Sequence, residues 1–254
     1  MRYVKLKITH KQLDSSYMTT TPTVKPVRLQ KYLADCGICS RRQAEIFIEE
    51  GRVMVNGSLA TLGMKVTDQD KISVDGKEII TSHKEKAVYL VYKPRGVTSS
   101  TKDIHAEHLV TSLVASEERL YPVGRLDRDS EGLIILTNDG NLTFTLTHPS
   151  FEISKKYHVF IEPDITNGDV EKLKKGIIHD REKLLLDDIH MLNPREVVIT
   201  LHHGKNRHIR RMFAALRYEV IRLIRTSIGP LTLADLAGKP YLRLTSDQVS
   251  SIVN

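Results

Sequence analysis

The segment 27–74 contains two kinds of apolar pattern. In its first part, apolar residues recur three and four positions apart, which predicts two short amphipathic helices. These residues are Leu29, Tyr32 and Leu33, followed by Ala44, Phe47 and Ile48. In its second part, alternating valines and the turn pairs Asn56-Gly57 and Asp75-Gly76 predict short strands joined by hairpins. The pattern therefore predicts a small unit of helices and short strands over residues 26–80.

Residues 86–254 mix strand-like and helix-like runs without a regular repeat. The strand-like runs are 88–92, 133–136, 157–161 and 197–201, and the helix-like runs are 170–175 and 209–217. Because strands and helices do not alternate, the order favours an α+β fold over a doubly wound parallel sheet. The segment lacks the glycine-rich loop that cradles nucleotide phosphates, which argues against nucleotide hydrolysis. The short polar stretch 81–86 predicts a linker between the two units.

The composition is that of a folded, moderately basic protein. The 254 residues include 38 Lys and Arg against 31 Asp and Glu, for a net charge of +7, and 40% of them are hydrophobic. These values exclude a fibrous repeat and an acidic disordered chain. No apolar window reaches 18 residues, so no membrane span is expected. The positive charge favours a polyanionic partner.

The first 25 residues carry five basic side chains and a single acidic one, Asp14. They contain no apolar run of signal-peptide length, so we expect a flexible basic tail. Two alternatives stay open at this stage. The tail could become ordered on RNA, or, being poor in acids and rich in Ser and Thr, it could be an organelle transit peptide. Met18 could also be the biological start.

The two cysteines, Cys36 and Cys39, form a C-x-x-C pair. A zinc site needs four ligands, and the sequence has no second pair or His cluster nearby. A thioredoxin-like site needs a βαβ context that the pattern does not predict. We therefore expect two reduced, structural thiols, which fits a cytoplasmic protein.

Arg41 and Arg42 fall in the first turn of the second predicted helix. Cations there oppose the helix dipole by about 0.3–1 kcal/mol each, so each should have a compensating partner. That partner is water, a carboxylate from Glu45 or Glu49, or an RNA phosphate beside the exposed helix amides. The surrounding stretch VRLQKYLADCGICSRRQAEIFIEEGRVMVNG resembles the S4 RNA-binding domain, which favours the phosphate. That domain implies RNA binding but no particular activity.

The stretch GRLDRDSEGL places Asp127 between Arg125 and Arg128, just before an apolar strand. Nearby guanidinium groups favour the ionised form of a carboxyl group. From the residues alone, Asp127 could be a nucleophile, a metal ligand or one half of a structural ion pair. Asp129 and Glu131 add carboxylates, but their spacing is not that of a calcium loop, so no metal site is expected.

Tyr157 follows two lysines at the start of a predicted strand. A tyrosine on a strand most often packs in a core or on a surface. Its flat ring can also stack on a nucleobase in an active site. The residues alone favour packing.

The segment 200–225 holds seven Lys and Arg side chains and one acidic residue. The basic residues are Lys205, Arg207, Arg210, Arg211, Arg217, Arg222 and Arg225. A charged run is often only a solvated face, but here apolar residues from Ile209 to Leu216 are interleaved with the charges. This pattern predicts a docked helix with one cationic face, suited to a phosphate backbone. His202, His203 and His208 lie in a strongly basic segment, so we expect no zinc site there.

Three stretches, GRLDRDSEGLIILTNDG, KKYHV and GKNRHIRRMF, occur in this order along the chain. Together with the S4-like unit, they resemble the RsuA/RluB-type family of ribosomal RNA pseudouridine synthases over about residues 27–247. The resemblance implies a catalytic domain with a mixed, mostly antiparallel sheet, which isomerises particular uridines without a cofactor or metal. It also assigns roles: Asp127 is the essential aspartate, Tyr157 the active-site tyrosine, Arg210 the arginine paired with the aspartate, Leu223 the apolar residue beneath the pocket, and Arg125 the arginine that holds the place of the flipped base.

The implied mechanism requires the uridine to leave its stack, because its reacting atoms cannot be reached inside a helix. Asp127 then attacks the ribose or takes a proton from it, while Arg210 keeps Asp127 ionised. Tyr157 stacks on the uracil, and Leu223 closes the floor of the pocket. RNA contacts are expected from Lys205, Arg207 and Arg211, in addition to Arg41, Arg42 and Arg125. The family commonly has Glu and Gln where this chain has His203 and His208, a departure that touches RNA contact rather than the catalytic set.

The stretches LTHPSFEISKKYHV and RLIRTSIGPLTLADLAGKPYLRLT resemble the large-subunit (23S) branch more than the small-subunit (16S) branch. The resemblance thus implies ribosomal RNA as the partner, and we expect a cytoplasmic monomer. The competing class is a non-catalytic RNA-binding or ribosome-assembly factor. In such a protein the S4-like unit and the basic segment would bind RNA, and Asp127 would be a structural ion pair.

Overall fold

The computed structural model describes residues 25–79, 85–103 and 106–253. The chain divides into two compact units, one drawn mainly from the residues up to Thr81 and one mainly from the residues after it. The tail predicted over residues 1–25 lies outside the described residues except for Lys25, as does most of the linker predicted over 81–86. Within the described ranges, no helix is long and apolar enough to cross a membrane.

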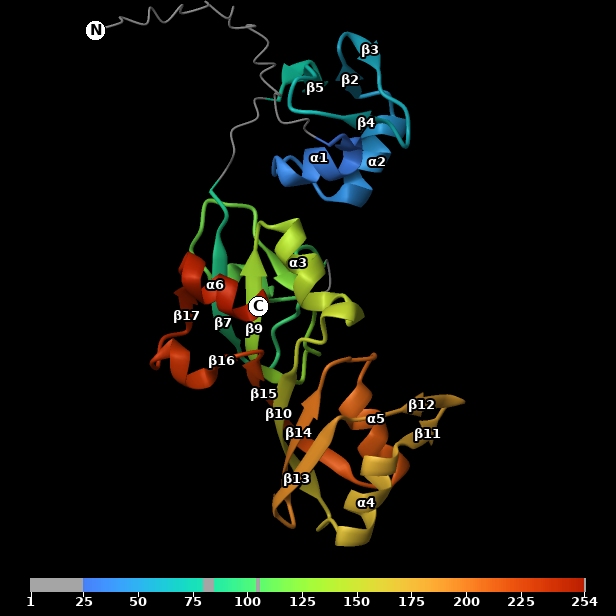
Figure 1. Ribbon diagram of the computed structural model, residues 1–254, viewed down its shortest axis with the longest axis vertical. Helices are drawn as coiled ribbons and strands as arrows, with labels where there is room; N and C mark the ends of the chain where they lie inside the picture. The colour runs from blue at the N-terminus through green and yellow to red at the C-terminus, as the bar shows by residue number, and fades with distance from the viewer. Residues whose placement is uncertain (1–24, 80–84, 104–105, 254) are drawn as a thin grey trace, which may run out of the picture. The chain divides into compact units, whose positions relative to one another are not determined.

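The N-terminal unit contains both helices that the sequence predicts, α1 (Leu29–Asp35) and α2 (Arg41–Glu49) (Figure 1). Their apolar stripes are buried, with Leu29 and Ala44 fully excluded from solvent. Its strands are β1 (Val27–Arg28), β2 (Val53–Val55), β3 (Ser58–Leu59), β4 (Lys65–Val66), β5 (Ile72–Val74) and β6 (Lys77–Glu78). Strands β3, β2, β5 and β6 form an antiparallel sheet in that order, while β1 pairs with β4.

The two predicted hairpin turns are present in this unit. Asn56 and Asp75 both have φ of 51°, and each is followed by a glycine that also has positive φ. Two consecutive left-handed residues are what a two-residue turn between twisted strands requires, which explains the Asx-Gly pairs.

The C-terminal unit is built on one large mixed sheet (Figure 1). Its strands are β7 (Val88–Lys93), β8 (Tyr121–Val123), β9 (Glu131–Thr137), β10 (Lys155–Glu162), β13 (Asp188–Asn193), β14 (Glu196–Leu201), β15 (Glu219–Ile228), β16 (Leu231–Thr232) and β17 (Tyr241–Arg243). The order is β13-β14-β10-β15-β9-β7-β17, with β16 beside β15 and β8 beside β9. Only the β9–β15 pairing is parallel among these described strands, which confirms the predicted α+β fold with a mostly antiparallel sheet.

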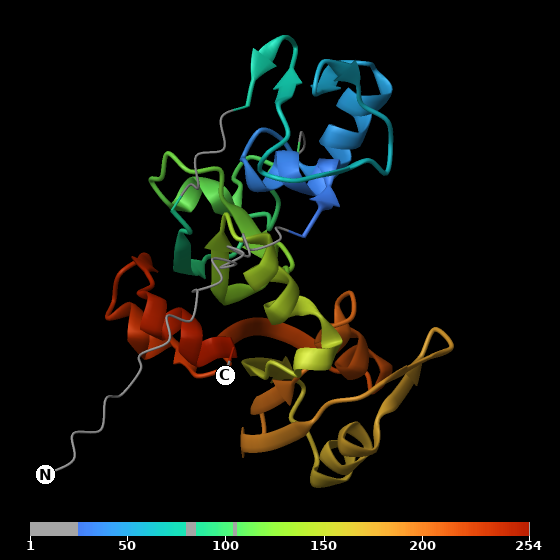
Figure 2. The ribbon, with the colours of Figure 1, turned by 45° about the horizontal axis from the view of Figure 1, so that its top comes forward.

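Helices and a small hairpin complete this unit. The helices are α3 (Gly140–Thr147), α4 (Asn167–Lys175), α5 (His208–Ala215) and α6 (Ser246–Val253), and short 3-10 turns cover Val110–Leu113, Pro149–Phe151 and Leu233–Leu236. Strands β11 (Ile177–His179) and β12 (Glu182–Leu184) form a separate hairpin that extends away from the large sheet, as Figures 1 and 2 both show.

One half of the sheet is covered on both faces. All seven residues of β9 are buried, and they alternate between two cores. Leu133 and Ile135 pack with α3 and α6, while Ile134 and Leu136 pack with the segment around Val110. This two-sided burial explains why β9 reads as a continuous apolar run.

The other half of the sheet has its core on the face covered by α4 and α5. Leu173 of α4 and Phe213 of α5 are fully buried against β10, β13, β14 and β15. Along β10, Tyr157, Val159 and Ile161 face this core, whereas the intervening residues are more exposed. The long strands β10 and β15 therefore join the two halves, and the loop before β9 reaches the junction.

The parallel contact between β9 and β15 depends on Gly132, which has φ of +107°. A β-carbon on Gly132 would lie 2.3 Å from the Arg225 carbonyl oxygen and 2.6 Å from the Arg225 nitrogen. No side chain fits at that separation, so the close approach of the two backbones requires glycine here.

The segment 200–225 differs from the sequence-based prediction. Only its middle, α5, is helical, and from Glu219 onward it belongs to β15. The helix ends because Leu216 leaves the helical conformation and Arg217 turns left-handed with φ of 64°. The prediction of one docked helix was therefore wrong for both ends of the segment, and the cations of 222–225 lie on a strand.

Candidate active site

Three residues singled out by the sequence meet at one pocket. Asp127 lies in the loop between β8 and β9, Tyr157 on β10 and Leu223 on β15, and all three line a cavity of about 340 Å³. The pairing of β10 with β15 sets Val159 opposite Leu223 and Tyr157 opposite Arg225. Tyr157 is 8% exposed and Leu223 is 6% exposed, whereas the side chain of Asp127 is 25% exposed to solvent. A cavity that sets an aromatic ring and aliphatic side chains beside an accessible carboxylate suits a flat, uncharged base attached to a sugar.

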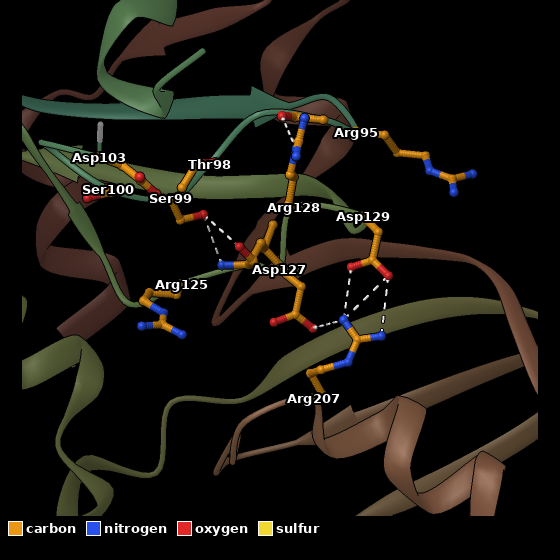
Figure 3. A pocket seen from close by; sticks show the side chains of 12 residues that line it. Arg95, Thr98, Ser99, Ser100, Asp103, Arg125, Asp127, Arg128, Asp129 and Arg207 are labelled. Atoms are coloured by element: carbon orange, nitrogen blue, oxygen red, sulfur yellow. Dashed lines mark hydrogen bonds and ion pairs between the residues drawn. The ribbon is translucent and has the colours of Figure 1, made fainter. Parts of the chain in front are cut away.

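Basic residues complete the lining of this cavity. Arg125, Lys205 and Arg207, all expected from the sequence to bind RNA, are among its lining residues. Arg207 is left-handed, with φ of 48°, and stands immediately before α5. Figure 3 shows Arg125 and Arg207 approaching from different sides, with the Asp127 carboxylate turned toward Arg207.

The backbone on either side of Asp127 is held by the loop that follows β7 (Figure 3). The Ser99 hydroxyl donates to the Leu126 carbonyl oxygen at 2.8 Å and accepts from the Leu126 amide at 3.1 Å. The Gly96 amide donates to the Arg128 carbonyl oxygen at 2.7 Å, and Arg128 Nε donates back to the Gly96 carbonyl oxygen at 3.2 Å. These bonds fix the chain one residue before and one residue after the carboxylate, which limits its movement.

A buried lysine supports the same loop. The Lys93 side chain is fully buried, and its Nζ donates to the carbonyl oxygens of Val97 at 2.8 Å and Pro94 at 3.0 Å. The Arg128 carbonyl oxygen lies 3.5 Å from the same nitrogen. These oxygens replace the water that a buried ammonium group loses. Burial nevertheless lowers the pKa of Lys93 to about 8, against the opposing effect of Asp129 and other nearby carboxylates.

The stability contributed at Lys93 should rise with pH. Lysine in an unfolded chain titrates near pH ~10.4, so between pH 8 and that value the unfolded state binds more protons than the folded state. The free energy of unfolding of the wild type, relative to Lys93→Met, is therefore expected to increase by about 2 kcal/mol from pH 8 to pH 10. Urea unfolding of both proteins across this range measures the difference, in which the other titrating groups cancel. A difference independent of pH would contradict the assignment.

Arg210 does not form the predicted pair with Asp127. Its Nε lies 3.3 Å from Asp129 Oδ2, and its terminal nitrogens donate to the carbonyl oxygens of Val220 at 2.7 Å and Asp129 at 3.1 Å. Instead, Arg207 Nη1 lies 3.9 Å from Asp127 Oδ2 and 3.3 Å from Asp129 Oδ1 (Figure 3). The bond to Val220 on β15 directs the Arg210 guanidinium toward Asp129, so Arg210 meets the loop through the neighbouring carboxylate.

Asp129 and Arg210 shift each other's pKa. Burial raises the pKa of Asp129, but the guanidinium groups of Arg210 and Arg207 outweigh it and lower the pKa overall. Burial likewise lowers the pKa of Arg210, with Asp129 and Asp127 opposing that effect. Asp129 is therefore ionised at neutral pH, and it holds both arginines next to Asp127.

Two expected RNA contacts are engaged within the protein. Lys205 Nζ lies 2.8 Å from Glu182 Oε1, and Arg211 Nη1 lies 2.7 Å from Glu182 Oε2. Arg211 also donates to the His179 carbonyl oxygen at 3.4 Å. Both side chains thus tie the β11–β12 hairpin to the start of α5, a role that their sequence positions did not indicate.

In the N-terminal unit, Arg41 and Arg42 are exposed in the first turn of α2. Neither side chain forms an ion pair with another described residue, and Glu45 instead accepts from the Gln30 amide at 3.1 Å. Cys36 and Cys39 are not joined by a disulfide. No group of three His, Cys, Asp or Glu residues that could hold a metal occurs in the described part of the chain.

Sequence reasoning missed the supporting residues of the site. Besides Lys93 and Ser99, Glu131 joins β9 to two other strands, accepting from Arg222 Nε at 2.7 Å and from the Tyr92 hydroxyl at 2.6 Å. The hydrogen bond from Arg222 is the largest of the effects that lower the pKa of Glu131. In the sequence, only the Lys93-Pro94 pair at the end of an apolar strand pointed to this support. A lysine that is buried at the end of such a strand needs carbonyl oxygens as partners.

Comparison with known proteins defines the class of this fold and site. Residues 87–215 match the RNA pseudouridylate synthase family, and residues 27–77 match the S4 domain. The chain belongs to the RNA pseudouridine synthase family, with an S4 domain preceding the synthase domain. This membership confirms the class of enzyme that the sequence resemblance implied, an isomerase acting on uridine in RNA.

Individual relatives cover most of the chain. Ribosomal large subunit pseudouridine synthase B of Bacillus subtilis (strain 168) is 38% identical over 233 residues, which are 89% of this chain and 95% of that protein. Dual-specificity RNA pseudouridine synthase RluF of Escherichia coli (strain K12) is 36% identical over 224 residues, which are 88% of this chain and 77% of that protein. A crystal structure of a pseudouridylate synthase shares the fold, with a TM-score of 0.65 at 24% identity over 89% of this chain and 100% of that one.

Proposed function

We propose that this enzyme converts a specific uridine of large-subunit ribosomal RNA to pseudouridine. The proposal depends on one observation, the cavity that brings the Asp127 carboxylate together with Tyr157 and Leu223. The choice of large-subunit RNA is supported by the similarity to ribosomal large subunit pseudouridine synthase B. We propose further that residues 26–80 bind RNA and residues 86–254 carry the chemistry.

The reaction exchanges one glycosidic bond for another. The C1′–N1 bond breaks, the uracil rotates, and a C1′–C5 bond forms, while a hydrogen leaves C5 and one is gained at N1. Asp127 acts at the ribose, as nucleophile or as base. Tyr157 stacks on the extruded uracil and Leu223 closes the floor, so that the freed base stays beside the sugar. Arg210 positions the aspartate loop through Asp129.

The remaining candidate residues contact RNA in this proposal. Arg125 occupies the place that the extruded base leaves, and Arg207, with Lys205 and Arg211 beside it, faces the backbone. Arg41 and Arg42 place two unpaired cations on the S4 domain for a structured RNA. The reaction rearranges bonds within one nucleotide, and we propose that it needs no cofactor or metal and that the enzyme works as a monomer in the cytoplasm.

Carbodiimide treatment and primer extension on ribosomal RNA from a strain lacking the gene test this function. We expect one pseudouridine stop to disappear from 23S RNA and to return with the wild-type gene but not with Asp127→Asn. Loss of a stop from 16S RNA instead would overturn the choice of subunit. If every stop persists in both RNAs, the enzyme does not act on a uridine of these RNAs and the proposed function is wrong.

A further inference from the structure

A second cavity adjoins the one that accommodates the base. It has a volume of about 750 Å³ and shares Arg125, Leu126, Asp127 and Arg207 with the smaller cavity. Its remaining lining comes largely from the loop that begins at Arg95 and from the residues just after Asp127. The two cavities therefore meet at the aspartate, and whatever enters the larger one is close to the reacting sugar.

The positive charge of this larger cavity is only partly neutralised, because four arginines (Arg95, Arg125, Arg128 and Arg207) and three acidic residues (Asp103, Asp127 and Asp129) line it. The carboxylates of Asp127 and Asp129 face Arg207, and Asp129 also faces Arg210. By contrast, the side chains of Arg95 and Arg125 have no ion pair or hydrogen bond with any other described residue. Figure 3 shows Arg125 on the side of Asp127 away from Arg207, and Arg95 extending outward past Asp129. After Arg222, Arg95 is also among the charges that lower the pKa of Glu131, which places it in electrostatic reach of the site.

We infer that the larger cavity binds the ribose–phosphate chain leading away from the target uridine, with Arg95 donating to a phosphodiester. This inference rests on the proposed function, which puts the target ribose at Asp127. That ribose carries a phosphodiester on both its 3′ and 5′ oxygens, so at least one charged linkage must lie beside the aspartate loop. The Arg95 guanidinium, which has no partner among the described residues and lines a cavity open to that position, matches one of these linkages. Holding it also offsets the cost of extruding the base.

The first test measures salt dependence with a ribosomal RNA transcript made with uridine tritiated at C5, because the reaction releases that hydrogen. Arg95→Gln is expected to lower kcat/KM roughly 10- to 100-fold. It should also flatten the slope of log kcat/KM against log salt by about 0.7–0.9, the value for one lost phosphate contact. Arg95→Lys should recover part of the activity. The matched control is Arg195→Gln, in the β13–β14 turn, where the side chain is 62% exposed and pairs with Asp164; it should behave as wild type.

A second test locates the contact. Once the wild-type reaction has identified the target uridine, short RNAs are made with one uncharged methylphosphonate linkage at each position flanking it. The linkage that reduces kcat/KM for the wild type should reduce it no further for Arg95→Gln. Full additivity at every linkage, or wild-type kcat/KM and slope for Arg95→Gln, would overturn the inference. If the wild type itself releases no tritium, the proposed function is wrong, which is a separate outcome.

Discussion

Asp127→Asn is expected to fold and bind RNA normally but to form no measurable pseudouridine. The amide keeps the shape of the side chain but can neither attack the ribose nor take a proton from it. The side chain is 25% exposed and its nearest cation is 3.9 Å away, so the folded state should lose less than about 1 kcal/mol. We expect the rate of tritium release to fall at least ~10⁴-fold, with the melting temperature and filter-binding affinity unchanged.

Asp129→Asn is the matched control for this variant. It removes a carboxylate two residues along the same loop, which contacts Arg207 and Arg210 at 3.3 Å but is not expected to touch the substrate. A smaller loss, about 10- to 100-fold, should result from misplaced arginines. Equal losses for the two variants, or activity within tenfold of wild type for Asp127→Asn, would contradict the role given to Asp127.

Gly132→Ala is expected to destabilise the C-terminal unit strongly. The new β-carbon would lie 2.3 Å from the Arg225 carbonyl oxygen, so β9 and β15 would have to separate. We expect the free energy of unfolding to fall by about 3–5 kcal/mol, measured by urea denaturation.

Gly238→Ala separates steric contact from backbone strain in this experiment. Gly238 also has positive φ, 78°, but a β-carbon there meets no atom within 4 Å. Its substitution should cost only about 1–2 kcal/mol, the price of a left-handed alanine. If both variants lost the same amount, the close approach of β9 and β15 would not be the cause.

Elements with a strong apolar period were predictable from the sequence, and weakly patterned ones were not. Strand β9 is apolar almost throughout because both its faces are covered. Helix α3 buries only Leu142 and Leu146 and is otherwise rich in β-branched threonine, so its sequence carries little helical signal. Helix α6 buries only Ile252. Both helices form because the sheet offers them an apolar surface, which a local pattern cannot reveal.

The site divides in the same way. Asp127, Tyr157 and Leu223 are far apart in the sequence. The residues alone left the role of Asp127 open and favoured ordinary packing for Tyr157. The family resemblance brought them forward, and the strand order places them around one cavity. The partner of Arg210 was not predictable, because it depends on a bond to the Val220 carbonyl oxygen across two elements. The buried ammonium of Lys93 depends on the path of the following loop in the same way.

The cavity lined by Asp127, Tyr157 and Leu223 is assembled across the junction of the two halves of the sheet, on strands that are continuous through both. Tyr157 and Leu223 cannot shift relative to the aspartate loop without breaking the β9–β15 pairing, where the backbones are in direct contact. The cavity is therefore already formed in the protein, so the RNA rather than the protein must change its conformation for the reaction. Discrimination among otherwise identical uridines should then follow how readily each local RNA loop unstacks, a property encoded in the substrate rather than in enzyme motion.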